Sequence, residues 1–258
     1  MEKLGDLLSG LDDPFEIVRR LRNATNDPWY IQYAEAVAMK MVTNIFSDAG
    51  RTWRQAANRN SKGGVLYRAL MQEFETSVGG AIMAQVRENA EYIRSVPADV
   101  AREMTEHIMH QSMAGFRASE IAEHLLSIYP HMSEVKANLI ARTETSKTRT
   151  ALEQARSERL GARWYQWRTS EDARVRKSHR LMDKVLVAWD DPPSPEALAG
   201  EKSVGHYHAG CIWNCRCAAL TVLTLDDVDW PCKVYRNGAV TTMTRAQFER
   251  IWTPSKVV

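Results

Sequence analysis

Apolar positions recur at helical spacing through the first half of the chain. After Asp27-Pro28, residue types that begin helices, an amphipathic run extends towards Asp48-Ala49-Gly50. A second apolar stripe covers residues 65–93 and is interrupted by Gly79-Gly80. Inside a helix, glycine costs about 1 kcal/mol relative to alanine. The pattern therefore predicts one helix over 28–48 and another over 65–93, with a kink or a break at the glycine pair.

Two prolines divide the stretch that follows. Pro97 is expected to begin a third helix, which ends at Gly115. Pro130 is expected to close a short helix capped by Ser119, because proline lacks the amide hydrogen that a helix interior needs. A longer helix with an N-cap at Ser133 is then predicted.

The pattern changes after Gly161, which suits the end of that long helix because glycine readily adopts left-handed backbone angles. Short β-prone runs predict three strands, over 163–169, 184–189 and 217–225. Between these strands the sequence predicts a helix over 172–182 and a loop rich in Pro, Gly and Ser over 190–205.

Asn237-Gly238 lies between two further β-prone runs and favours a hairpin over 232–242, with a short helix over 245–252 after it. The elements together predict an α+β protein with a mainly helical N-terminal part, a small α+β C-terminal module and a terminal β-hairpin. The expected domains are a helical domain, the α+β module and a tail of hairpin and short helix, over 1–130, 131–225 and 226–258.

The composition of 44% hydrophobic and 26% charged residues is typical of a globular protein with a real core. No run of eighteen apolar residues occurs, so no membrane span or membrane partner is expected. The acidic, amphipathic start lacks the features of a secretory signal, which favours action inside a cell or inside a particle assembled there. A net charge of only +2 argues against nucleic-acid binding by overall charge.

Locally, residues 136–180 are basic, with twelve Lys and Arg against five Asp and Glu, a net charge of +7. Such a stretch can contact DNA phosphates without sequence preference, or simply form a solvated helix face. The candidate residues for contact with double-stranded DNA are Lys147, Arg149, Arg156 and Arg159.

All four cysteines fall in the last quarter of the chain, at Cys211, Cys215, Cys217 and Cys232. Two thiolates one residue apart, at 215 and 217, can bind one ion, and Zn²⁺ favours sulfur and nitrogen ligands. The alternative is that these cysteines are buried small side chains without a ligand role. A structural zinc is favoured over a catalytic one, because no H-x-E or HExxH pattern is present and a small module gains stability from a bound metal.

Four blocks in the second half occur in a fixed order: IARTETSKT (140–148), W-x-T-S-x-D (167–172), D-x-R-V-R-x-S-H-x-x-x-D (172–183) and G-x-x-x-N-C-R-C (210–217). Together they resemble the phage Mu protein F-like head-morphogenesis family over roughly 115–225. The chain departs from the family at Met182-Asp183-Lys184, where many relatives have Gly after Leu-Asp, and at Ala209-Gly210, where relatives often have Pro-Gly.

The resemblance adds a metal ligand. Some relatives carry Cys-x-x-Cys where this chain has Arg176 and His179, which implies His179 as the third ligand beside the two cysteines of 215–217. For the fourth ligand, Cys211 is favoured, then His208, with His206 and Asp172 as further alternatives.

Inside the IARTETSKT block, Arg142 and Glu144 lie on different faces of a helix, because they are two residues apart. Each is expected to form an ion pair with the C-terminal module, Glu144 with Arg174 or Arg176, and Arg142 with Asp172.

The resemblance implies a minor capsid protein inside the phage head, present in the host cytoplasm during assembly. The expected partners are the portal protein, the major capsid or scaffold protein and packaged DNA. No catalytic residue and no enzymatic activity are expected. The alternative is a zinc-dependent nuclease or hydrolase packaged as an effector. The stretch of about thirty residues after 225 argues against it, because it is too short for most catalytic domains.

Overall fold

The computed structural model describes residues 2–59, 73, 76–114 and 116–252. By contacts the chain divides into two compact units. Unit 1 comprises Met1–Met41 and Val86–Ala141, and unit 2 comprises Val42–Gln85 and Arg142–Val258. The domain limits expected from the sequence stay a prediction.

Unit 1 is helical. It contains α1 (Glu2–Asp6), α2 (Pro14–Ala24) and parts of three long helices, α3 (Pro28–Arg59), α5 (Ser77–Met113) and α6 (Ala118–Leu160). Their apolar faces form one core that includes Leu21, Val100, Met104 and Leu125. The Tyr30 hydroxyl donates a hydrogen bond to the Ile93 carbonyl at 3.0 Å. The predicted helical N-terminal part is confirmed.

Several predicted helix limits are wrong. α3 continues to Arg59 instead of ending near residue 48, and Pro97 and Pro130 lie inside α5 and α6. Ser133, predicted as an N-cap, is a buried residue within α6. An interior proline costs roughly 3 kcal/mol in a helix, and the apolar packing around these positions, such as that of Val96 and Tyr129, offsets this cost.

The glycine pair at 79–80 also differs from the expectation. Because α5 begins at Ser77, Gly79-Gly80 falls in its first turn and does not interrupt a longer helix. Residues 65–72 of the predicted stripe, and the predicted helix end at Gly115, lie outside the described residues. None of the described helices is long and apolar enough to span a membrane.

In unit 2, α6 ends where predicted. Gly161 has φ +72°, and the amide of Ala162 bonds back to the Ser157 carbonyl at 2.8 Å. The chain then forms a five-stranded sheet in the order β3-β1-β2-β4-β5. The strands are β1 (Trp164–Arg168), β2 (Leu186–Ala188), β3 (Ala218–Thr221), β4 (Cys232–Arg236) and β5 (Ala239–Met243).

Most neighbouring strands are antiparallel, and β2 and β4 pair in parallel. The predicted strands and hairpin are confirmed, and Asn237 and Gly238 have the positive φ angles of a tight turn. Short helices complete the unit: α7 (Lys177–Met182), α8 (Pro195–Leu198), η2 (Leu225–Asp227) and α9 (Arg245–Glu249). The α8 helix lies in the stretch predicted as loop.

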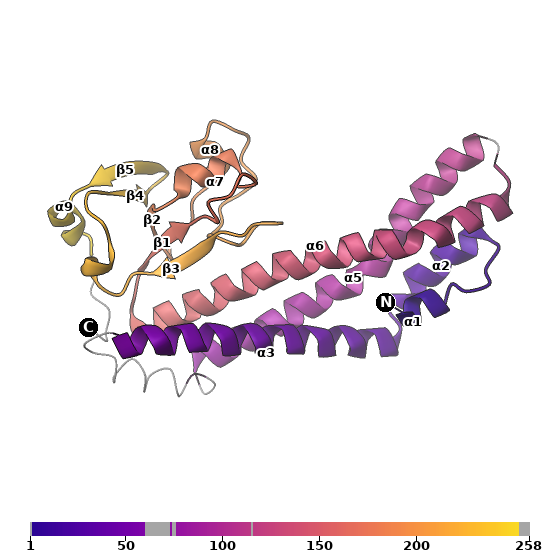
Figure 1. The fold of residues 1–258 in the computed structure, drawn as a ribbon, viewed down its shortest axis with the longest axis horizontal. Helices are drawn as coiled ribbons and strands as arrows, with labels where there is room; N and C mark the ends of the chain where they lie inside the picture. The colour runs from indigo at the N-terminus through magenta and orange to yellow at the C-terminus, as the bar shows by residue number, and fades with distance from the viewer. Residues whose placement is uncertain (1, 60–72, 74–75, 115, 253–258) are drawn as a thin grey trace. The chain divides into compact units, whose positions relative to one another are not determined.

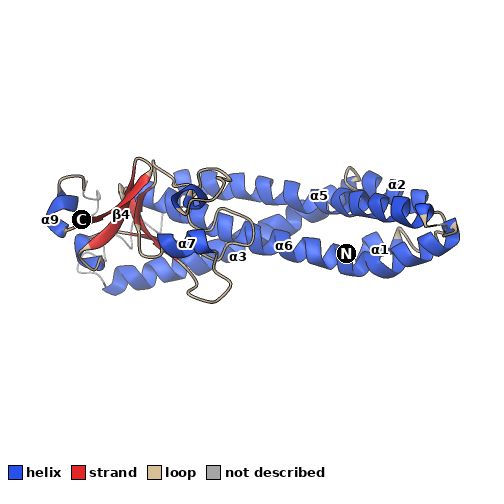
Figure 2. Cartoon of the chain, turned by 90° about the horizontal axis from the view of Figure 1, so that it is seen from above, coloured by secondary structure: helices blue, strands red, loops and turns tan. Residues whose placement is uncertain are grey.

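The sheet has a core on each face, because successive strand residues point to opposite sides. Trp164 packs with Phe248 of α9 on one face, while Tyr165 and Trp167 pack with Met182 of α7 on the other. Figures 1 and 2 show α7 and α9 on opposite sides of the strands. The face of Trp167 carries the candidate site.

Candidate metal centre

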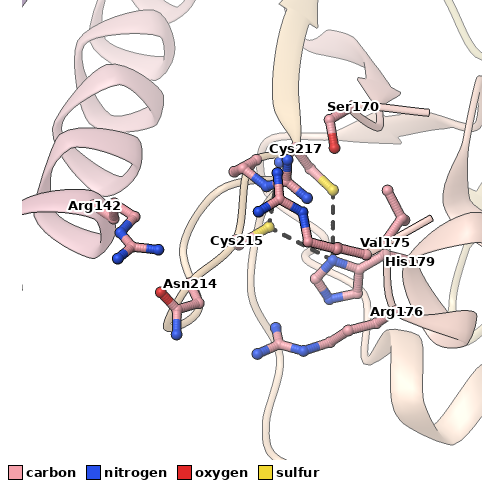
Figure 3. A pocket seen from close by; sticks show the side chains of 10 residues that line it. Arg142, Ser170, Val175, Arg176, His179, Asn214, Cys215 and Cys217 are labelled. Carbon is pink, nitrogen blue, oxygen red and sulfur yellow. Dashed lines mark hydrogen bonds between the residues drawn. The ribbon is translucent and has the colours of Figure 1, made fainter. Parts of the chain in front are cut away.

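Three predicted metal ligands come together on this face. His179 lies on α7, and Cys215 and Cys217 lie in the loop before β3. The His179 Nδ1 atom is 3.5 Å from the Cys215 Sγ and 3.4 Å from the Cys217 Sγ (Figure 3). All three side chains are buried, and their ligand atoms lie within 4.8 Å of one another. A His/Cys group of this kind can hold a metal ion.

The loop that carries both cysteines is fixed to one face of α6 by hydroxyl groups. Thr150 Oγ1 donates to the Ala209 carbonyl at 2.6 Å, and Ser146 Oγ donates to the Cys215 carbonyl at 2.7 Å. The Asn214 amide donates to Thr143 Oγ1 at 3.1 Å. Because these hydroxyl residues are three and four positions apart, they share one helix face. That spacing is the sequence signal that would have identified them.

Gly210 allows the loop to approach α6 closely. Its φ is +86°, and a Cβ at this position would lie 2.7 Å from Thr150 Oγ1 and 3.0 Å from the Cys217 carbonyl oxygen. A glycine is therefore required both for the left-handed backbone and for space. Relatives often have Pro-Gly where this chain has Ala209-Gly210, and the turn at Gly210 forms here without the proline.

A hydrogen-bonded relay through Tyr207 and Glu196 holds the His179 imidazole on the side away from the two cysteines. Its Nε2 lies 3.0 Å from the Tyr207 hydroxyl, which donates to Glu196 Oε1 at 2.6 Å. The Ser178 hydroxyl also donates to Glu196 Oε1, at 3.2 Å. Burial, together with Glu196, raises the pKa of Tyr207, so Tyr207 keeps its proton. The relay fixes the imidazole with Nε2 towards Tyr207 and Nδ1 towards the cysteines. Its acid and phenol come from a predicted loop and were not identified from the sequence.

The two thiols shift each other's pKa in opposite directions. Hydrogen bonding with Cys217, and then with His179, lowers the pKa of Cys215 to about 4. The thiolate on Cys215 in turn raises the pKa of Cys217. The site thus holds a thiolate beside an imidazole nitrogen, which is the donor chemistry that a borderline-soft cation prefers.

The spacing of the donors fits zinc. Tetrahedral zinc, with bonds of about 2.3 Å to sulfur and about 2.0–2.1 Å to nitrogen, places a sulfur and a nitrogen ligand about 3.5 Å apart. The two Sγ to Nδ1 distances, 3.5 and 3.4 Å, agree with that value. The relay to Tyr207 and Glu196 is the kind of support that orients a ligating histidine in metal sites.

In front of the three residues lies a cavity of about 410 Å³. Four arginines line it together with Ser170, Val175 and Asn214, namely Arg142, Arg174, Arg176 and Arg216. None of the described lining residues is acidic. The ligand group is therefore buried on one side by the sheet and faces an arginine-rich cavity on the other (Figure 3).

The alternatives for a fourth ligand lie outside the three-residue group. His208 Nδ1 is 3.2 Å from the Tyr165 hydroxyl, and burial lowers the pKa of His208 to about 4. The exposed His206 bonds to the Pro192 carbonyl at 3.0 Å. Cys211 is half-buried, and Asp172 pairs with Arg216, which lowers its pKa to about 2.

The predicted ion-pair residues make the following contacts in the structure. Glu144 is buried and pairs with Lys147, one turn further along α6, at 3.3 Å. Arg174 lies 3.9 Å from Asp172, and Arg176 donates to the Trp213 carbonyl at 2.9 Å. Arg142, predicted to pair with Asp172, lines the cavity.

One predicted DNA-contacting residue is excluded. Arg156 is only 1% exposed and pairs with Glu73 through two hydrogen bonds, at 2.7 and 2.9 Å, so it cannot contact DNA in this structure. Lys147 is mostly buried, Arg149 is exposed and Arg159 is half-buried.

Comparison with known proteins gives a family match. Residues 101–220 match the family model described as phage Mu protein F like protein. A protein of Haemophilus influenzae (strain ATCC 51907 / DSM 11121 / KW20 / Rd), described as an uncharacterized protein, is 30% identical over 135 residues. The alignment covers 52% of this chain and 28% of that protein. No solved structure matches the chain.

Proposed function

We propose that this protein, whose residues 101–220 match the model of the phage Mu protein F-like family, is a minor component of the phage head that acts in head morphogenesis. The family match carries the proposal. The family is one of phage head proteins and is not an enzyme family. Because the chain spans only 28% of the relative that it matches, the role of the whole protein is itself part of the proposal.

The geometry of the matched region supports a structural role. The blocks of the resemblance meet at one site, where α6 anchors the loop with Cys215 and Cys217, and α7 supplies His179. Each block thus contributes to holding the sheet, the loop and the helix together. A site of this construction suits a structural role.

We further propose that the group of His179, Cys215 and Cys217 holds a structural zinc ion. Supporting this are the donor set, the Sγ to Nδ1 distances near 3.5 Å and the relay through Tyr207 and Glu196. When bound, zinc would join α7 to the cysteine loop. A structural zinc is favoured over a catalytic one because a catalytic zinc commonly works beside an acid or base, and the described residues lining the cavity include no carboxylate.

The zinc proposal is tested by elemental analysis of the purified protein. Close to one equivalent of zinc is expected in the wild type, and a large decrease in the double variant Cys215→Ser/Cys217→Ser. Cys232→Ser is the control, because Cys232 is a buried cysteine of β4 outside the group. A metal-free wild type with the same melting temperature as protein purified with added zinc would refute it.

Contacts with the portal protein and with the major capsid or scaffold protein are part of the proposed role. Non-specific contact with packaged DNA through Lys147, Arg149 and Arg159 is proposed as well, supported by the local positive charge and by the exposure of Arg149. The protein would then be found in the head interior and, during assembly, in the host cytoplasm.

The role is tested in virions of the phage that encodes the protein. Mass spectrometry of purified particles should detect the protein at a copy number far below that of the major capsid protein. Co-expression with the portal protein should allow the two to be purified together. Absence from purified virions, or a measurable hydrolytic activity that disappears in point variants that still enter particles, would contradict the proposed role.

A further inference from the structure

The cavity in front of the metal centre carries a concentrated positive charge. Four arginines line it, and the Asp172 carboxylate pairs with two of them, Arg174 and Arg216. The cavity thus brings four guanidinium groups together in a chain whose net charge is only +2. A zinc site with one imidazole and two thiolates is neutral overall, so a bound metal would not offset this charge.

Two of the arginines are held in place by hydrogen bonds. Two hydrogen bonds from Arg216 to Asp172 fix its guanidinium, and a hydrogen bond to the Trp213 carbonyl fixes that of Arg176. The side chain of Arg174 is 80% exposed, and Arg142 reaches the cavity from α6 (Figure 3). A fixed pair beside an exposed arginine suits a planar oxyanion, because the guanidinium fork bonds carboxylates and phosphates in a bidentate manner.

An exposed aromatic side chain lies against Arg176, one of the arginines that line the cavity. Trp213 is 54% exposed, and the Arg176 guanidinium lies over its ring, 5.6 Å from the centroid. Tryptophan and arginine are among the residue types most enriched in the side chains that dominate protein interfaces. An apolar surface beside a positive cavity matches a partner segment with an acidic side chain next to an apolar one.

We propose that this cavity is a docking site for an acidic segment of a partner protein, with a carboxylate among the arginines and an apolar side chain on Trp213. The proposal extends the assembly role proposed above by giving the chemistry of the partner, and it does not depend on the identity of the metal. Duplex DNA fits less well, because its phosphates follow a convex surface and favour an extended basic face. A cavity of about 410 Å³ admits one or two side chains.

Fluorescence anisotropy with a labelled hexaglutamate peptide tests the site on the full chain. The double variant Arg142→Gln/Arg174→Gln should bind the peptide at least tenfold more weakly than the wild type. The control Arg163→Gln/Arg245→Gln removes the same charge from exposed arginines that lie off the cavity, and should change binding less than twofold. Trp213→Ala should weaken binding of a peptide with alternating Glu and Leu more than that of hexaglutamate.

Several results would overturn the inference. They are the absence of peptide binding at millimolar concentration, equal decreases in the two double variants, and a 20-base-pair duplex that displaces the peptide and depends on the same two arginines. The last result would assign the cavity to nucleic acid. Zinc content and melting temperature, measured on each variant, separate this test from the metal proposal. A wild type that retains zinc but does not bind the peptide would refute only the docking site. A wild type that binds the peptide but contains no zinc would refute only the zinc proposal.

Discussion

The ion pair between Arg156 and Glu73 permits a quantitative test of the packing of unit 2. The two side chains are 1% and 4% exposed, and the pair is bidentate. The Arg156 guanidinium also lies over the Phe46 ring, 5.3 Å from its centroid. Replacement of Glu73 by Gln keeps the shape but leaves the buried arginine without a counter-charge.

Removing one partner of a buried ion pair destabilises a protein by about 3–5 kcal/mol, because the remaining charge is buried and uncompensated. With a urea m-value of about 2 kcal/mol/M, Glu73→Gln should lower the unfolding midpoint of unit 2 by about 1.5–2.5 M. The double variant Glu73→Leu/Arg156→Met should recover most of this stability, because it removes both charges.

Tryptophan fluorescence during urea unfolding is the appropriate measurement, since Trp29 is the one tryptophan of unit 1 and the other seven belong to unit 2. The matched control is Asp190→Asn, the same chemical change in an exposed pair with Arg163, which should cost under about 1 kcal/mol. The reasoning fails if Glu73→Gln costs no more than Asp190→Asn, or if the double variant is as unstable as the single one.

Three further predictions concern the loop, the acid response and the basic stretch. Gly210→Ala should lower both melting temperature and zinc content, because its Cβ would contact Thr150; Gly200→Ala, with a similar φ of +74° in open space, should keep its zinc. Burial lowers the pKa of His208 to about 4, so the folded state binds fewer protons than the unfolded state below pH 6.5. The contribution of His208 to the free energy of unfolding should therefore be fully present above pH 6.5 and fall by about 2–3 kcal/mol towards pH 4. A His208→Gln variant should show a smaller difference between its urea midpoints at pH 7 and pH 4.5 than the wild type. The variant Arg149→Gln/Arg159→Gln should flatten the salt dependence of DNA binding, by about 0.9 in log–log slope for each phosphate that the variant no longer neutralises, and an unchanged slope would refute binding through these arginines.

Features set by local chemistry were predictable from the sequence. Gly161 ends its helix and Asn237-Gly238 forms its hairpin because positive φ angles are required at those positions. His179, Cys215 and Cys217 were identified as one group because their chemistry and the resemblance to a known family agree. In each case the residue type and the sequence around it indicate the role, and contacts with distant parts of the chain are not needed for the prediction.

Features set by packing were not predictable. Proline ordinarily ends a helix, but Val96 and Tyr129, next to Pro97 and Pro130, are buried in a core built from several elements. Arg156 stands among basic residues that favour a solvated face, while its partner is 83 residues away in sequence. Glu196, which supports His179 through Tyr207, falls in a stretch that resembles an ordinary loop.

The contacts between α6 and the cysteine loop explain the structural role of the IARTETSKT block. Thr143 and Ser146 of the block, with Thr150 one turn beyond, bond the backbone of the cysteine loop instead of surrounding a substrate. The position of the two cysteines therefore depends on the C-terminal part of α6, and metal binding would stabilise α6, the loop and α7 together. A helix that fixes a metal loop in this way favours a structural role for the block over a catalytic one.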